Sequence, residues 1–250
     1  MATSAALGSL IMADGFDLSC YLKSVEVAGN VDMLDNTALC ATASRTYQPG
    51  LVERTITGES FFAYDGTTDA NSIDKTFSDA MDASANKHFL IAPNGYSAVG
   101  DFCFICNTKQ ANYSISETVG ELIMLSFEAK TCSDSTHGNH AAGARILMHA
   151  TQTGTANETS IDNGAASTGY LAQCHVSSAS SLSSVTVKVQ HSTDNSSWAD
   201  LCTFTTFTAI GAEQKFSTST SVNRYRRAIV SAWSGTSAKI TVGFKSAWDD

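Results

Sequence analysis

The sequence has little proline and few charged side chains. Only 2 of its 250 residues are proline, and Asp, Glu, Lys and Arg together make up 16%, against about 25% in an ordinary soluble domain. This scarcity, with many β-branched residues, argues against a helical bundle and against a disordered chain. Hydrophobic residues make up 43%, enough for one or two domains with a real core. We therefore expect an all-β protein.

Long hydrophobic runs and a basic charge balance are also missing. No apolar stretch approaches the ~18 residues that span a bilayer. Residues 1–12 carry no basic residue ahead of their apolar part, unlike a secretory signal. The net charge is −9, whereas proteins that bind nucleic acids or anionic membranes carry a basic surface. We predict no membrane partner and no specific binding of nucleic acid.

The sequence contains none of the common enzyme signatures. It lacks the G-x-S-x-G elbow, the H-E-x-x-H helix, the P-loop and the G-x-G-x-x-G turn. Its six histidines are scattered, and no Ser/His/Asp set stands out from the abundant serines. We predict that the protein is not an enzyme, with no catalytic residues and no cofactor.

Seven cysteines are an odd number, and most lie in apolar or alternating runs. We interpret them as reduced thiols of a protein made in a cytoplasm. Cys103 and Cys106, with Cys132, His137 and His140, are residue types that suit zinc. However, residues 102–106 are strand-like, and side chains three apart on a strand face opposite ways. The loop at residues 65–71 collects calcium-type oxygen ligands but lacks an EF-hand's Gly and closing Glu. We predict no metal site.

Charge divides the chain into two parts. Residues 133–143 are small and polar and carry no hydrophobic period, which is typical of a boundary. Residues 1–143 hold 7 basic and 17 acidic residues, a net charge of −10, and residues 144–250 hold 8 and 7, a net charge of +1. We predict domains at 1–143 and 144–250, with a boundary anywhere between 133 and 165.

Alternation in the first part predicts strands and one helix. The turn residues at 48–51 precede a strand at 51–62 whose Glu53, Thr55, Thr57 and Glu59 share one wholly polar face. A helix is expected from Asn71 or Ser72 to about residue 85, with Phe77 on its apolar face. Further strands are expected at 18–31, 88–92, 98–108, 112–116 and 121–130.

The second part is more uniformly β. Short alternating runs separated by turn residues predict a β-sandwich or jelly roll, with strands at 169–177, 184–191, 200–207, 213–216, 224–233 and 239–244. Its one basic cluster, Arg224, Arg226 and Arg227, could contact phosphate, but we favour a solvated surface. Its aromatic residues favour the core over a sugar-binding surface; they include Trp198, Tyr225 and Trp233.

Several short motifs together resemble the major tail (tail tube) proteins of bacteriophages. VEVAGNVDMLD at 25–35 and TYQPG at 46–50 are similar to the family's V-D-x-L-D-x-T segment and Y-x-P-G turn. Ile56-Thr57-Gly58 fits the next strand, and residues 118–127 look like the V-G-x-x-x-x-F-S strand with Leu125 replacing Phe. Ala38-Leu39-Cys40-Ala41 departs from the usual Phe-Gly. Residues 191–201 and 222–226 look like sandwich modules appended to tail proteins.

The resemblance implies an N-terminal tail-tube-type β-sandwich, a C-terminal outer sandwich and a structural role in the virion tail, after assembly in the host cytoplasm. Such subunits form stacked, typically hexameric rings, so self-association, other tail proteins and passing viral DNA are the implied partners. Glu53, Thr55, Thr57 and Glu59 are candidate lumen residues, because an acidic wall does not grip phosphates. The alternative is a minor tail, decoration or adhesin-like protein that recognises carbohydrate through its C-terminal sandwich.

Overall fold

The computed structural model describes residues 8–37, 45–62, 77–78, 86–132 and 140–246. Strands make up about two thirds of these residues and only Phe77 and Ser78 are helical, which confirms the all-β prediction. Among them, no helix is long and apolar enough to cross a membrane. The strands of the first part are β1 (Leu10–Ala13), β2 (Phe16–Asp17), β3 (Leu22–Asp35), β4 (Tyr47–Phe61), β5 (Lys87–Ala92), β6 (Phe102–Ser116) and β7 (Met124–Thr131).

The remaining strands build the second part. They are β8 (His140–Gln152), β9 (Ala156–Asn157), β10 (Ile161–Asp162), β11 (Ser167–Ser180), β12 (Ser184–Ser192), β13 (Ala199–Thr203), β14 (Gly211–Val222), β15 (Tyr225–Ser234) and β16 (Ser237–Ser246). Two sheets result. One has 11 strands and runs β14-β11-β16-β8-β6-β5-β1-β2, with β7, β4 and β3 joined onto β6, and the other is β10-β15-β12-β13 with β9.

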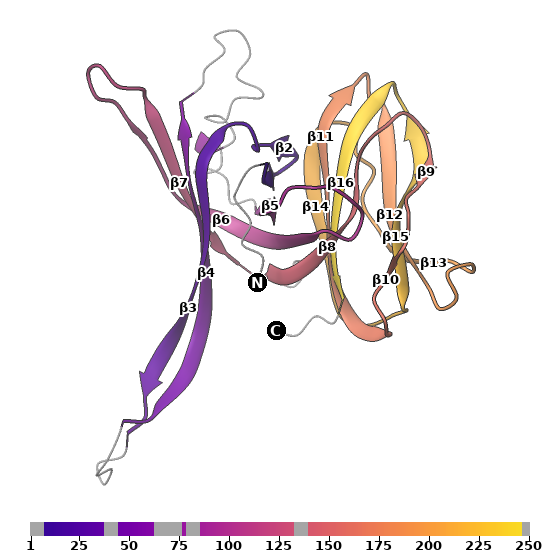
Figure 1. The fold of residues 1–250 in the computed structure, drawn as a ribbon, viewed down its shortest axis with the longest axis horizontal. Helices are drawn as coiled ribbons and strands as arrows, with labels where there is room; N and C mark the ends of the chain where they lie inside the picture. Colours follow the sequence, from indigo (N-terminus) through magenta and orange to yellow (C-terminus); the bar gives the residue numbers. More distant parts are fainter. Residues whose placement is uncertain (1–7, 38–44, 63–76, 79–85, 133–139, 247–250) are drawn as a thin grey trace.

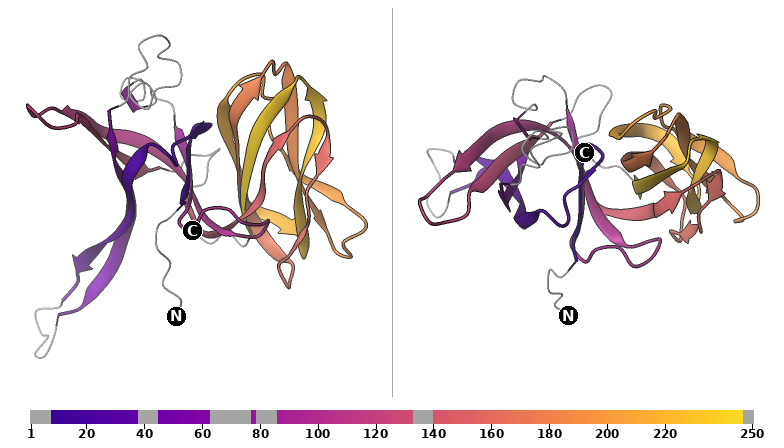
Figure 2. Two further views of the ribbon diagram at one scale, coloured as in Figure 1. Left: turned by 45° about the horizontal axis from the view of Figure 1, so that its top comes forward. Right: turned by 90° about the horizontal axis from the view of Figure 1, so that it is seen from above.

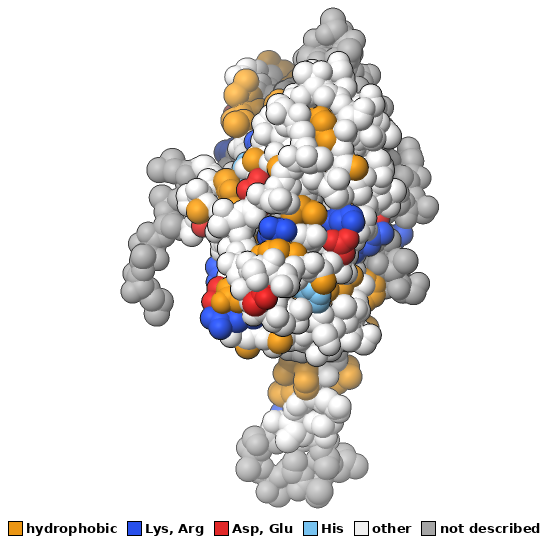
Figure 3. Space-filling view, turned by 90° about the vertical axis from the view of Figure 1, so that its right-hand side faces the viewer, with side chains coloured by type: hydrophobic (Ala, Val, Ile, Leu, Met, Phe, Trp, Pro, Cys, Tyr) orange, Lys and Arg blue, Asp and Glu red, His pale blue; other side chains and the backbone are white. Residues whose placement is uncertain are grey.

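The second part is a sandwich, as the alternation predicted. Strands β8, β16, β11 and β14 face the five-stranded sheet (Figure 1). One buried cluster fills the space between them, with Leu147 and Val242 from one sheet and Val187 and Val230 from the other. The outer face of the five-stranded sheet shows mostly backbone and uncharged polar side chains, crossed by a short band of charged and hydrophobic ones (Figure 3).

Strand β8 joins the two parts. Its first residues pair with Cys103 and Ile105 of β6, and its later residues pair with β16 up to Gln152↔Ala238. The two parts therefore share one continuous sheet and lie side by side (Figure 2). The boundary predicted after Gly143 falls inside β8, and separate folding of 1–143 and 144–250 stays a prediction.

A separate buried cluster fills the junction of the two parts. It brings Leu90 and Ile105 of the first part against Ile146 and Leu171 of the second. The contact needs a glycine, since a Cβ on Gly243 would lie 2.7 Å from Ile105 Cγ2 and 2.8 Å from Leu90 Cδ1. The backbone at Gly243 in the second part therefore packs directly against side chains of the first part, so the two parts are not joined by a loose linker.

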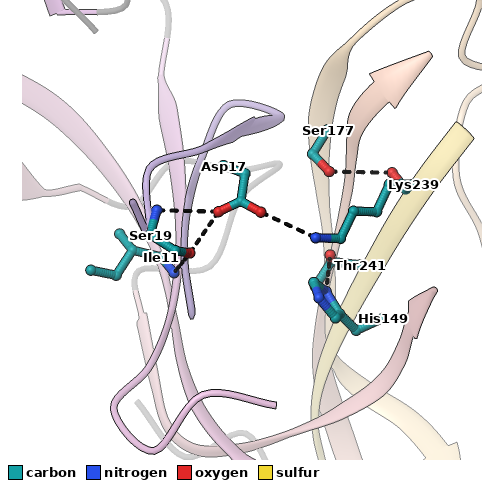
Figure 4. A network of polar contacts seen from close by, with 7 residues as sticks. All are labelled: Ile11, Asp17, Ser19, His149, Ser177, Lys239 and Thr241. Atoms are coloured by element: carbon teal, nitrogen blue, oxygen red, sulfur yellow. Dashed lines mark hydrogen bonds and ion pairs between the residues drawn. The ribbon is translucent and has the colours of Figure 1, made fainter. Parts of the chain in front are cut away.

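Polar contacts close the same junction (Figure 4). Asp17 of β2 accepts hydrogen bonds from the Ser19 hydroxyl at 2.6 Å and forms a 3.2 Å ion pair with Lys239 of β16. The buried His175 of β11 accepts a 3.2 Å hydrogen bond at Nδ1 from the backbone N–H of Gly15. Its Nε2 lies 2.9 Å from Gln173 Oε1, and Gln173 donates to the Cys106 carbonyl at 3.1 Å.

One local prediction is wrong. Residues 48–51 are not a turn but belong to β4, where Gln48 and Pro49 pair with Leu34 and Met33 of β3. The register shifts between Val31↔Val52 and Met33↔Pro49, so two residues of β4 stand opposite Asp32 alone. Proline and glycine are tolerated in such a bulge, which gives the same sequence signal as a turn. Most of the predicted helix and the loop at 65–71 lie outside the described residues.

Candidate assembly surface

Strands β3, β4, β7 and the outer part of β6 form a four-stranded antiparallel sheet that projects from the molecule (Figure 1). Its long β3–β4 hairpin extends in one direction and its β6–β7 hairpin in another. We call the side of this sheet that bears Glu53, Thr55, Thr57 and Glu59 the polar face. Cross-strand register adds Ser24, Glu26, Ala28 and Asn30 of β3, Ser126, Glu128 and Lys130 of β7, and Asn112 and Ser114 of β6.

The four predicted residues thus share one face, which is the open side of the sheet. Glu53 and Glu59 are exposed, and Thr55 and Thr57 are half-buried, whereas the intervening Ile56, Gly58 and Ser60 are buried. A shallow groove of about 520 Å³ runs over this face between Glu26, Glu59 and Glu128. That the face lines a lumen stays a prediction.

The polar face carries four glutamates and one lysine among its 13 residues, a net charge of −3, so it is more acidic per residue than the first part, which has a net charge of −10 over 143 residues. Lys130 Nζ lies 2.8 Å from Glu53 Oε1, and the hydrogen bond and charge of Glu53 raise the pKa of Lys130. Because the pair is exposed, it contributes little stability. The ion pair mainly affects the surface potential, because Lys130 offsets the charge of Glu53. The acidic groups that line the groove are Glu26, Glu59 and Glu128.

The opposite side of the same sheet is its packed side. Phe77 is fully buried against it, with its ring centroid 3.9 Å from that of Phe127. Ile56 and Leu125 belong to the same cluster, and Val25 and Val27 pack on its border. Gly58 leaves the space for this stack, because a Cβ there would lie 2.5 Å from the Phe127 ring. The sheet therefore has a covered apolar side and an open polar side.

Two edges of this sheet are open within the described chain. β3 pairs with β4 only, and residues 109–116 of β6 pair with β7 on one side, while β5 reaches only as far as Thr108. An open edge offers a row of N–H and C=O groups for pairing with another chain. The two edges lie at opposite sides of the sheet, so one can meet the other on a second copy.

Large apolar side chains are exposed at both ends of the sheet. The outer half of the β3–β4 hairpin, which we call the arm, exposes Val31, Met33, Leu34, Tyr47, Leu51 and Val52, and Leu51 is 82% exposed. The tip of the β6–β7 hairpin exposes Ile115, Val119 and Leu122. Apolar groups gathered in this way are typical of protein–protein contact surfaces.

No protein-family model matches the chain, and no curated protein matches its sequence. Solved structures do resemble its fold. A chain from the virion of a native gene transfer agent particle is 14% identical, with a TM-score of 0.40, over 53% of this chain and 96% of that one. A chain from the tail of the empty particle, solved with C6 symmetry, is 12% identical, with a TM-score of 0.37, over 50% and 83%.

The crystal structure of the SPP1 Dit (gp 19.1) protein, described as a paradigm of hub adsorption apparatus in phages that infect Gram-positive hosts, is similar over nearly the whole chain. It is 12% identical, with a TM-score of 0.36, over 95% of this chain and 99% of that one. At these identities the likeness is one of fold.

The structure separates the other candidate residues. Cys103 and Cys106 are buried in β6 and belong to different clusters, as expected for residues three apart on a strand. Burial raises the pKa of Cys103, and it raises that of Cys106 to about 12, so both stay thiols. Cys132 contacts Asn86 and Asn107. In the described part of the chain, no three His, Cys, Asp or Glu residues are placed to hold a metal.

The basic cluster is not one solvated surface. Arg224 is exposed and forms a bidentate pair with Asp162, and Arg227 stacks 4.2 Å over the Trp198 ring. Arg226, in contrast, is 1% exposed, so the predicted solvated position is wrong for it. The physical reason is that β15 turns Arg226 toward the sandwich interior, beside Ala228 and Val230 on the same face.

Sequence reasoning found the polar face but missed the arm. The sequence did contain a signal for the arm, because Val31, Met33 and Leu51 are large apolar residues that are unusual in a solvated hairpin tip. Reading 48–51 as a turn ended the hairpin early and hid their common location.

Proposed function

We propose that this chain is a structural subunit of a phage-type virion tail that assembles into rings around a channel. The open β3 edge of one copy would pair with residues 109–116 of β6 in the next. Such a head-to-tail contact closes into a ring and leaves no free edge. The observation that carries the proposal is the combination of two open edges with an open polar face between them.

Channel size favours a ring of about six subunits. Four strands per copy give 24 strands, and at ~4.8 Å per strand the barrel has a circumference of at least ~115 Å and a diameter of ~37 Å. Three copies would give only ~18 Å, which side chains would fill. The wider barrel can pass duplex DNA without specific binding, and its wall would include Glu53, Thr55, Thr57 and Glu59.

The rest of the molecule takes an outer position in this arrangement. The second part is fixed rigidly beside the sheet and would surround the tube, where other tail proteins can contact it. The arm would cover its apolar side chains against a neighbouring copy or the next ring. The role is structural and not enzymatic, and the location is the virion tail, after assembly in the host cytoplasm.

The test is negative-stain electron microscopy of the purified protein, with light scattering on the same sample. We expect rings or stacked tubes with a central hole. Leu51→Glu should shift the distribution to monomers, because burying a leucine contributes about 1.5–3 kcal/mol at each contact. Thr203→Glu, at an exposed site on the outer sandwich, is the matched control and should assemble normally.

Two outcomes would contradict the proposal. One is a wild-type protein that stays monomeric at high concentration and on addition of tail initiator proteins. The other is assembly that tolerates Leu51→Glu and Thr203→Glu equally, which would place the contact elsewhere.

The alternative, a carbohydrate-binding protein, needs an exposed aromatic platform on the outer sandwich. One face of the Trp198 ring is covered by Arg227. Trp233 packs on the core, and its Nε1 donates to the Gly235 carbonyl at 3.0 Å. These contacts favour the structural role, and a glycan screen on the second part would reverse that preference if it found a ligand.

A further inference from the structure

Arg226 is a buried cation among apolar neighbours. It is 1% exposed, and its guanidinium carbon lies 5.8 Å from the Phe244 ring centroid. Its Nη2 donates a long hydrogen bond of 3.4 Å to the Ser167 hydroxyl, and its buried Nε has no hydrogen-bond partner among the described residues. A buried charge left in this state is costly unless an anion accompanies it.

The nearby carboxylates are engaged elsewhere. Both oxygens of Asp162 accept from Arg224, at 2.7 and 2.6 Å, and one also accepts from the Gly164 N–H. Asp101 caps the turn at Ser97 and Ala98. Desolvation lowers the pKa of Arg226 to about 10, so the guanidinium still carries its charge at neutral pH.

Arg226 lines a small pocket at one end of the outer sandwich. The pocket has a volume of about 60 Å³ and lies between β8, β10, β15 and β16. Two further cations line it, Arg145 and Lys245, together with the polar side chains of Asn163 and Ser246. No carboxylate is among its described lining residues.

Gly143 lies in the wall of the pocket beside Lys245. A Cβ at Gly143 would lie 3.4 Å from Lys245 Nζ, and the φ of +78° is one that favours glycine. The Asn163 side-chain amide donates to Ser246 Oγ at 3.3 Å, which fixes one wall. The volume exceeds that of a single water site, for which about 10–15 Å³ suffices.

We propose that this pocket binds a phosphate-class oxyanion, held by Arg226 with Lys245 and Arg145 at its rim. A guanidinium fork and an ammonium group together match two or three oxygens of a tetrahedral anion. The anion would supply the partner that Arg226 Nε lacks. The site is independent of ring formation, since every residue that lines it belongs to one copy.

The test is isothermal titration calorimetry with inorganic phosphate at constant ionic strength, beside glycerol 3-phosphate. We expect wild-type protein to bind with one site per chain. Equal binding of both ligands indicates a pocket for a phosphoryl group carried on a larger molecule, and binding of phosphate alone indicates a free ion. Arg226→Met should abolish binding, and Lys245→Gln should weaken it about tenfold, the loss of one charge-assisted hydrogen bond.

Arg227→Gln is the matched control, because it removes the same charge from the adjacent position but on the other face of β15. It should leave the affinity unchanged. If Arg226→Met does not fold, Arg226→Lys keeps the charge without the fork and should still bind more weakly. The proposal is overturned if no oxyanion binds to wild type, or if Lys245→Gln and Arg227→Gln weaken binding equally.

Discussion

His175 is predicted to make the stability of the junction depend on pH. Desolvation, with a smaller effect of His88, lowers the pKa of His175 to about 3. Its Nδ1 must stay unprotonated to accept the Gly15 N–H. In the unfolded chain the same imidazole has a pKa of about 6.5. The unfolded state therefore binds the proton more tightly, and at a pH between these two pKa values unfolding is accompanied by uptake of a proton.

The sign and size of the effect follow from this difference. The free energy of unfolding falls as the pH is lowered through the window from about 6.5 to 3, by up to ~1.4 kcal/mol per pH unit. Between pH 7 and pH 5 the loss from His175 alone is about 2 kcal/mol. His175→Asn keeps an acceptor near the Nδ1 position but cannot titrate, so it should remove the contribution of His175, while His149, whose pKa is lowered by desolvation to about 4, keeps its own part of the slope. At pH 7 it should cost about 2 kcal/mol through lost packing and the lost contact to Gln173.

The assay is urea unfolding at pH 5, 6 and 7 for wild type, His175→Asn and His191→Asn. His191 is half-buried in the other sheet and its Nδ1 accepts from the Asn223 N–H, so the variant controls for loss of any partly buried imidazole. Burial lowers the pKa of His191 as well, but His191 is only partly buried whereas His175 is fully buried, so we expect His191→Asn to lose less of the slope than His175→Asn. A slope that His175→Asn leaves unchanged would refute the reasoning, because the proton uptake would then belong to other groups.

Two further predictions address the junction and the polar face. Gly15→Ala should destabilise the protein by several kcal/mol in urea unfolding, because the added Cβ would lie 2.6–2.8 Å from backbone atoms of Gly211 and Val176. Gly164→Ala, at the similar φ of +78° with open space around it, isolates the backbone cost of about 1–2 kcal/mol, and equal effects of the two would contradict the packing argument. Assembled rings of Glu59→Lys should bind duplex DNA in a salt-dependent way, measured by co-sedimentation, and wild-type rings that bind as well would argue against a lumenal position.

Much of the strand pattern could be predicted because alternation is a local signal. The alternating run predicted at 184–191 is an example. Val185, Val187 and Val189 of β12 all point into the core, since each strand there is covered on one side only. Strand ends were less predictable, because pairing extends them. The small polar residues of β14 continue as strand to Val222 through their pairing with Ser167 and Thr168 of β11.

Breaks in alternation explain the other differences. Segments 98–108 and 112–116 were predicted as two strands, but a single strand, β6, runs from Phe102 to Ser116 with a bulge between Gln110 and Asn112. Strands β1 and β2 are too short to show a period. They form because β5 pairs with β1 and β1 in turn pairs with β2. Junction contacts such as Gly15 with His175 join residues 160 positions apart, a separation at which no local pattern operates.

The structure also changes how the acidity of the first part should be interpreted. A net charge of −10 over residues 1–143 suggested a strongly acidic wall, yet the acids have several separate roles. Asp14 pairs with Lys87 at 3.0 Å, Asp17 pairs with Lys239, and Asp101 caps a turn. The polar face is left with a few glutamates and the paired Lys130. A ring built from it would repel DNA mildly at each copy, and repetition around the channel would supply the field that no single subunit carries.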